Sequence, residues 1–366
     1  QNDNTPLSRR KLEDRKRELY FAKQASLGKL NNIEINSNPY QGNLTDENLF
    51  VPLHEPLQSG EEKEIKLQYT IQLPQDIYTG YGYQDMKALL KYFFIVPDGF
   101  EAINHFNKYY VDIEETQSGG KKWKVDFTLP EAYQVQSNLA KINSNSFSGY
   151  LTTDPEFYIS LITNEELNFN VEGQNINLQF GYPLTHDEKS YLEFYLPLQL
   201  QFLKKKIGNL PDKLFFSQKF KNKNDFFGND DIKFWKFKFQ MFNDAEKIDM
   251  DYFSMVSTAV VDNLLITNKT EDHWIKNGIK TYLETSYIQS FYADKKLIGN
   301  LADTIAPLGL KPLKIFHASK LDLLERYGIM YQYMSSQNLD QKIGNKFTKL
   351  SNFNEMAISQ FKTGSL

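Results

Sequence analysis

The chain of 366 residues contains no cysteine. This absence excludes disulfide bridges, cysteine-based zinc sites, thiol nucleophiles and a lipid-anchored cysteine within these residues. Histidine is scarce, since there are five in the chain and no two have the four-residue spacing of the zinc-binding H-E-x-x-H pattern. The longest apolar candidate, residues 256–266, is interrupted by Asp262 and Asn263 and falls short of the ~18 residues that cross a bilayer. The sequence therefore predicts neither a conventional zinc helix nor a transmembrane helix.

Neither sign of charge dominates the chain. Its formal net charge is −4 and its pI is near 5.9, which is too balanced to favour nucleic acid or an anionic membrane as partner. Apolar residues are plentiful, with 40% hydrophobic and 14% aromatic residues, enough for one large core or two moderate ones. We therefore expect two domains.

The first 31 residues form a charged segment. A short helix is expected over Ser8–Lys29, where basic residues alternate with acidic ones. A basic arm for nucleic acid is the alternative, but the interleaved acids favour a solvated helix face. Residues 1–31 are therefore predicted to be a charged N-terminal helix or arm.

Residues 32–183 have the pattern of an antiparallel β-domain. Apolar residues alternate strictly with polar ones in two stretches, before Pro74 and before Pro130. Gly- and Asn-rich breaks separate such stretches, as hairpins and loops require. A β-sandwich is predicted. The alternating apolar residues are Ile65, Leu67, Tyr69, Ile71 and Leu73 in the first stretch, and Trp123, Val125 and Phe127 in the second.

From residue 184 to residue 366 the periodicity is mainly helical. Thr185 and Glu188 are spaced as a capping box, and Gly208 with Pro211 ends the helix that they begin. Pro197 should kink this helix or mark its true start. The predicted apolar positions are Tyr191, Leu192, Tyr195, Leu198, Phe202 and Leu203, and a strand is expected over Lys213–Phe220.

Two further helices are expected after the one that begins at Thr185. A basic and aromatic segment lies between that first helix and the two later ones. Lys233–Phe239 could stack on bases along a basic groove, but the balanced charge favours an amphipathic strand or sheet edge. The first later helix places Met250, Phe253, Met255, Val256, Ala259, Val260 and Leu264 on one apolar face, and the second does so with Trp274, Ile275, Ile279, Tyr282, Leu283 and Phe291.

The segment Asp272–Gly278 opens the second later helix with Trp274, Asn277 and Gly278. It resembles the aminopeptidase N-like family of gluzincin zinc metallopeptidases, whose corresponding helix begins W-L-x-E-G with Glu as the third zinc ligand. Asn277 stands at that Glu position. The family's two histidine ligands lie nineteen and twenty-three residues earlier, which correspond to Thr258 and Ser254 here.

Other parts of the family's chemistry are also replaced. The general-base Glu corresponds to Met255, and the Tyr that stabilises the oxyanion corresponds to Phe361. Lys221–Asp231 has no G-x-M-E-N sequence, whose Glu holds the substrate amine in active members. The resemblance thus implies a catalytically degenerate member, a pseudopeptidase with no bound metal and no cofactor.

The resemblance also implies an α+β fold. An N-terminal antiparallel β-sandwich is expected over residues 32–183 and corresponds to only part of the family's first domain. It precedes a thermolysin-like mixed α/β pseudo-catalytic domain over residues 184–366, which is expected to be incomplete at its C-terminus. The family positions still matched are Asn263, Trp274, Gly278 and Tyr282.

We therefore expect a non-catalytic scaffold or protein-binding subunit. Its partners would be the protein subunits of an exported, cell-envelope or outer-membrane complex in a Bacteroidota-like bacterium, and no nucleic acid. Because the chain begins with Gln1, a removed leader is expected, with a periplasmic, outer-membrane-associated or cell-surface location. Two alternatives stay open: a peptide-binding module that uses the old cleft, and a zinc aminopeptidase with a rebuilt site.

Overall fold

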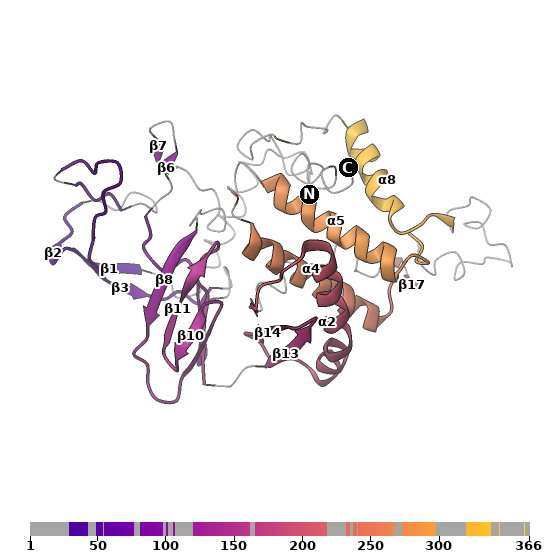
Figure 1. Ribbon diagram of the computed structural model, residues 1–366, viewed down its shortest axis with the longest axis horizontal. Coiled ribbons are helices and arrows are strands. Elements are labelled where there is room, and N and C mark those ends of the chain that lie inside the picture. The colour runs from indigo at the N-terminus through magenta and orange to yellow at the C-terminus, as the bar shows by residue number, and fades with distance from the viewer. Residues whose placement is uncertain are drawn as a thin grey trace.

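The computed structural model describes residues 29–42, 49–53, 55–76, 81–97, 100–101, 105–106, 120–161, 165–217, 232–234, 237–239, 241–265, 267, 273–297, 320–337, 344 and 362. The expected arm before residue 29, the segment Lys221–Asp231 and Phe361 lie outside these residues. The described part is a mixed α+β structure. Most strands gather at one end of the molecule and the helices at the other, with β13 and β14 close to α2 (Figure 1).

The first half of the described chain is built from antiparallel sheets. One sheet has the order β2-β1-β3, a second β10-β11-β8 and a third β4-β5-β12-β9, and β6 pairs with β7. The bounds are β1 Lys29–Ile35, β2 Asn38–Pro39, β3 Leu67–Gln72, β4 Gly82–Gln84, β5 Lys87–Leu90, β6 Phe100–Glu101, β7 His105–Phe106, β8 Lys121–Asp126, β9 Gln134–Ser137, β10 Ala140–Asn143, β11 Ser146–Leu151 and β12 Phe157–Ser160.

The predicted alternation is confirmed in β3 and β8. Leu67, Tyr69 and Ile71 are half-buried between exposed neighbours in β3, and Trp123 and Val125 are half-buried in the same way in β8. Ile65 was expected in the first strand, but it lies before β3 and is exposed. Lys29, the last residue of the expected arm helix, instead begins β1.

Two of these sheets share an aromatic core. Phe147 of β11 and Phe157 of β12 are fully buried, and their ring centroids are 5.9 Å apart in an edge-to-face arrangement. Phe127 packs against Phe157 at 4.9 Å. Edge-to-face aromatic pairs stabilise beyond the area that they bury, so this cluster joins the sheet of β8, β10 and β11 to the sheet of β12.

Helix α2 (His186–Ile207) begins as predicted. The Thr185 hydroxyl accepts from the backbone N–H of Glu188, and the Glu188 carboxylate accepts from the backbone N–H of Thr185. The helix ends at Gly208, whose φ of 98° suits glycine. Pro197 lies inside the helix, so of the two alternatives predicted for it, a kink or the true start of the helix, the second is wrong. The start is set instead by the capping box, which satisfies the first free N–H groups.

The buried face of α2 differs in part from the predicted one. Leu192, Phe202 and Leu203 are buried as expected, whereas Tyr191 is exposed. Leu196 and Leu200, which were not predicted to be buried, are fully buried. The helix is followed by β15 (Lys213–Phe216), which pairs in parallel with β14 (Gln174–Phe180), while β13 (Glu166–Val171) pairs antiparallel with β14. The predicted segment Lys233–Phe239 forms two short antiparallel strands, β16 (Ile232–Phe234) and β17 (Phe237–Phe239).

Three more helices complete the described structure: α4 (Asp244–Leu264), α5 (His273–Phe291) and α8 (Glu325–Ser336). Helix α4 starts before its predicted apolar stretch, because Asn243 and Glu246 form a second capping box. Its predicted face is buried except at Leu264, which is exposed near the end of the helix. In α5 the expected core residue Tyr282 is 51% exposed, whereas the unpredicted Tyr287 is buried.

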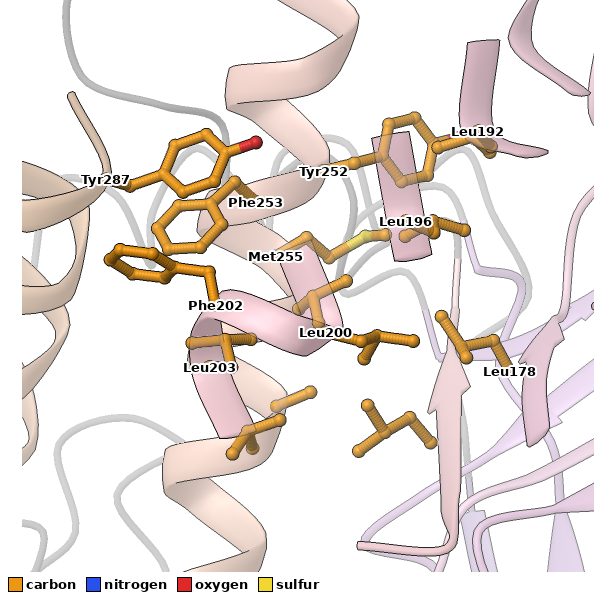
Figure 2. Packing of buried hydrophobic residues seen from close by; sticks show 14 of the residues in the cluster. Leu178, Leu192, Leu196, Leu200, Phe202, Leu203, Tyr252, Phe253, Met255 and Tyr287 are labelled. Atoms are coloured by element: carbon orange, nitrogen blue, oxygen red, sulfur yellow. The ribbon is translucent and has the colours of Figure 1, made fainter. Parts of the chain in front are cut away.

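The core of the helical half is centred on stacked aromatic rings. Phe253 of α4 and Tyr287 of α5 stack at 3.9 Å with their planes 12° apart, and Phe202 of α2 meets both rings edge-on (Figure 2). This packing fixes α4 against α5, the two helices that carry the predicted zinc-ligand positions. Within the described residues, no helix is long and apolar enough to cross a membrane.

Two polar side chains, Thr152 and Lys213, are among those that connect the strand-rich and helical halves. The Thr152 hydroxyl donates to the backbone oxygens of Asp262 (2.9 Å) and Asn263 (3.2 Å) at the C-terminal end of α4. The Lys213 ammonium donates to the carbonyl oxygen of Leu139 at 3.0 Å. Because the last carbonyls of a helix have no partner within the helix, Thr152 acts as a cap supplied from a distant segment.

Candidate functional site

The predicted zinc-ligand positions lie on two packed helices. Ser254, Met255 and Thr258 are in α4, and Asn277 is in the first half of α5. An ion pair between Lys276 and Asp262, with 2.9 Å between nitrogen and oxygen, fastens the start of α5 to the end of α4. The two helices therefore run antiparallel, so that residues early in α4 face residues late in α5.

Ser254 stands where the resemblance expects the first histidine ligand. It is fully buried, and its hydroxyl donates to Oε1 of Glu284 on α5 at 2.7 Å. Its backbone oxygen accepts from the hydroxyls of Ser257 (3.1 Å) and Thr258 (2.7 Å). The side chains at both expected histidine positions are thus hydrogen-bonded to residues of the helix pair itself.

Met255 occupies the position expected for the general base. Its side chain is 2% exposed and belongs to the core of the helical half. The Tyr182 hydroxyl lies 3.8 Å from the Met255 sulfur and 3.3 Å from the Tyr252 hydroxyl, which donates to Oε1 of Glu188 at 3.4 Å. Burial raises the pKa of both tyrosines, and Glu188 adds to this effect, so both hydroxyls stay protonated.

Asn277 stands at the position of the family's ligand Glu. Its side chain is half-buried, and its backbone oxygen accepts from the Thr281 hydroxyl at 2.9 Å. The carboxylate that reaches Ser254 comes from Glu284, seven residues further along α5. Residues seven apart lie on the same face of a helix, so Glu284 occupies the Asn277 face two turns later.

Sequence reasoning missed the surroundings of Glu284. This carboxylate is 6% exposed, and the Lys280 ammonium lies 3.9 Å away, one turn earlier on α5. On α8, Arg326 donates to the Tyr327 hydroxyl at 3.0 Å. The pKa of Tyr327 is raised by burial first, while Arg326 lowers it and the Glu284 charge raises it further. The seven-residue spacing was the one sequence signal that could have identified Glu284.

A second buried carboxylate, Asp249, holds the helices together. It accepts from the Gln199 amide at 2.7 Å, from the Tyr287 hydroxyl at 2.9 Å and from the Tyr292 hydroxyl. Burial raises the pKa of Asp249, although these hydrogen bonds oppose the rise. Because its donors come from α2, α5 and the residue that follows α5, Asp249 has a structural role.

The donor atoms near Ser254 do not suit a zinc ion. Zinc sites in proteins use Cys, His, Asp and Glu in sets of three or four, whereas the expected ligand positions here supply a serine, a threonine and an asparagine. No cluster of three or more His, Cys, Asp or Glu side chains that could hold a metal ion occurs in the part of the chain that the structure describes. His186 is exposed, and the side chain of His273 lies outside the described residues.

Comparison with known proteins gives a distant structural likeness. No family model and no curated protein matches the sequence. A crystal structure of an M1 zinc metallopeptidase from Deinococcus radiodurans is 13% identical, with a TM-score of 0.44, covering 92% of this chain and 78% of that chain. A mutant of the Deinococcus radiodurans M1 zinc metallopeptidase is 11% identical with a TM-score of 0.44, and the match covers 84% of this chain and 65% of that one. The chain is thus similar to M1 zinc metallopeptidases at low identity, and its membership of that family stays a prediction.

Proposed function

We propose that this chain is a non-catalytic relative of the M1 aminopeptidases that works as a scaffold or protein-binding subunit in an exported, cell-envelope complex. One observation carries the proposal: the side chains at the expected ligand and base positions in α4 make hydrogen bonds or core contacts within the protein. Ser254 donates to Glu284, Thr258 donates to the backbone of its own helix, and Met255 fills the core. An active zinc site needs side chains directed at a metal and an open position for water.

The environment of Met255 supports the proposal that no general base acts at this position. A base must lie within hydrogen-bond reach of a water molecule or substrate, but the side chain at this position is nearly inaccessible to solvent. A carboxylate buried there without partners would cost several kcal/mol, on the order of the penalties known for unpaired buried charges. An apolar side chain is therefore the stable choice at this position.

The binding role and the envelope location rest on the sequence resemblance alone. They are tested by isolating the full chain from its native cells, after cell fractionation and mild cross-linking, and by measuring the mass of the species that contains it. The proposal predicts an envelope fraction in which the chain is bound to defined partners in fixed stoichiometry. A monomer in the soluble cell extract would contradict it.

The same preparation distinguishes the alternatives. A peptide-binding module predicts saturable binding of peptides without cleavage, which calorimetric titration with a mixed peptide library measures. A rebuilt zinc aminopeptidase predicts bound zinc and release of amino acids from aminoacyl substrates. Either result, obtained without stable protein partners, would replace the scaffold proposal.

A further inference from the structure

Strand β13 lies at the edge of its sheet and has few of the usual protections against further pairing. In the part of the chain that the structure describes, β13 pairs with β14 alone, over six residues in a continuous register. It contains no lysine and no proline, and its only charged side chain is Glu166 at the first position. Three other edge strands are protected, because β8 carries three lysines, β10 has an irregular register and β2 contains Pro39. An unprotected edge is a template for one more strand.

The backbone groups along this edge belong to alternate residues of β13. The Phe180 N–H donates to the Glu165 oxygen at 3.0 Å, whereas Asn177, which lies opposite Asn168, donates to the Asp212 oxygen on the β15 side. In an antiparallel pair, every second residue exchanges hydrogen bonds with its partner strand. The odd-numbered residues of β13 therefore bond to β14, and the even-numbered ones direct their N–H and C=O groups outward. The outward residues are Glu166, Asn168 and Asn170, and their side chains are exposed.

A row of side-chain amides covers the exposed face beside the edge. The Asn177 amide donates to Oδ1 of Asn168 at 2.8 Å, and the Asn170 amide donates to Oδ1 of Asn175 at 2.7 Å. An asparagine amide has two donor hydrogens and an acceptor oxygen. Asn168 and Asn170 can therefore make further hydrogen bonds to a strand that carries amides at matching positions.

The edge matches a second copy of itself. In an antiparallel pair centred on Asn168, this residue faces Asn168 of the second copy, and Glu166 faces the other copy's Asn170. All outward N–H and C=O groups of the edge then have partners, and the two Glu166 carboxylates are about 14 Å apart along the strands. On the opposite face, Leu167 meets Phe169 of the second copy, and Phe169 is only half-buried within one chain. Such apolar cross-strand pairs stabilise a sheet.

We propose that two copies of this chain form a twofold dimer through β13, which joins their sheets into one continuous sheet. A twofold interface uses the same surface on both subunits, so that surface must match itself, and the register centred on Asn168 meets this requirement. The dimer is independent of the proposed scaffold function, because it needs neither another protein nor the positions in α4 and α5.

Sedimentation of the purified full chain over a range of concentrations tests the proposal. Edge pairing buries a small area, so we expect a reversible equilibrium between monomer and dimer. Asn168→Pro removes the outward N–H at the centre of the interface, while the bonds to β14 remain because neighbouring residues make them. This variant should raise the dissociation constant about tenfold or more. Asn168→Thr keeps the N–H and should still form the dimer.

Cysteine cross-linking tests the register, because the chain has no cysteine of its own. The Cα atoms of a hydrogen-bonded antiparallel pair are about 5.5 Å apart, which a disulfide can bridge. Asn168→Cys should therefore give a covalent dimer under mild oxidation. Asn175→Cys is the matched control, because this exposed residue of β14 would lie at least about 14 Å from its copy and should not cross-link.

Three results would overturn the proposal. The first is a wild-type chain that sediments as a monomer at every concentration. The second is equal cross-linking of Asn168→Cys and Asn175→Cys, because the copies would then meet elsewhere, and this comparison decides the matter if Asn168→Pro does not fold. The third is a monomer that binds an unrelated extended peptide along β13, because the edge would then serve a different partner.

Discussion

Replacing Met255 by glutamate would restore a carboxylate at the position of the family's general base. Met255 lies in the same core as Leu196 and Leu200 (Figure 2) and is almost inaccessible to solvent. The variant loses about 1.5–3 kcal/mol of apolar burial. It also buries a charge, at a cost of several kcal/mol that the nearby Tyr182 hydroxyl would offset by only about 1 kcal/mol. We expect Met255→Glu to lower the free energy of unfolding by about 4–6 kcal/mol at pH 7.

The pH dependence of this loss has a defined sign. Burial raises the pKa of an introduced glutamate in the folded state above its unfolded value of about 4.3. Below the unfolded pKa both states carry the neutral acid, so the charge penalty is absent. As the pH rises through the window between the two pKa values, the unfolded state ionises first, and the variant loses about 1.4 kcal/mol of stability per pH unit.

Urea unfolding followed by circular dichroism from about pH 4 to pH 8 measures this profile, because the range spans the unfolded pKa. Met255→Leu controls for the change of side chain, and Met255→Gln controls for polarity without charge. Both controls should show the same pH dependence as the wild type. A Met255→Glu variant as stable as Met255→Gln at pH 8 would refute the reasoning, because a carboxylate would then have solvent or a cation beside it.

Three further changes test other contacts. Ser254→Ala should cost about 1–3 kcal/mol of unfolding free energy, because it removes a donor from the buried Glu284 carboxylate, and the cost should largely vanish in a Glu284→Gln background if the charge is responsible. Burial lowers the pKa of Lys213 to about 8, so the wild type should gain stability as the pH rises from about 8 to the unfolded pKa of about 10.4, and Lys213→Met should flatten this part of the profile. Thr152→Val should cost about 1 kcal/mol and, in hydrogen exchange, should increase opening at the C-terminal end of α4 more than at its N-terminal end.

Local sequence signals predicted helices α2, α4 and α5 and several strands, but not α8. The start of α2 at Thr185 and Glu188 and the apolar face of α4 around Phe253 and Val256 are confirmed. These features depend on residues within one or two turns of each other, and this is the range over which capping and helical periodicity act. The alternation in β3 and β8 was predictable for the same reason.

Features set by distant segments could not be predicted. Leu196 and Leu200 are buried because β13 and α4 cover that side of α2, and Tyr282 is exposed because α4 covers a different side of α5. The pairing of Ser254 with Glu284 depends on the antiparallel packing of two helices. Periodicity shows that a helix has an apolar face, but only the tertiary structure shows which polar residues at its edges meet a partner.

The prediction of a lost zinc site rests on residue identity at Ser254, Met255, Thr258 and Asn277. The structure adds what the side chains in α4 do instead, and it identifies Glu284 as the carboxylate beside Ser254. In the part of the chain that the structure describes, no three His, Cys, Asp or Glu side chains cluster as the ligands of a zinc ion would. The proposed inactivity therefore has a physical basis in the donor atoms present.

Zinc content and peptidase activity of the same purified full chain test the central claim most directly. The chain would be prepared without chelators, supplied with zinc, freed of excess metal by gel filtration, and analysed for metal and for hydrolysis of a panel of aminoacyl amides. We predict zinc far below one ion per chain and no hydrolysis above that of buffer, because the expected ligand positions hold serine, threonine and asparagine. About one zinc per chain, together with hydrolysis that a chelator abolishes, would contradict the account.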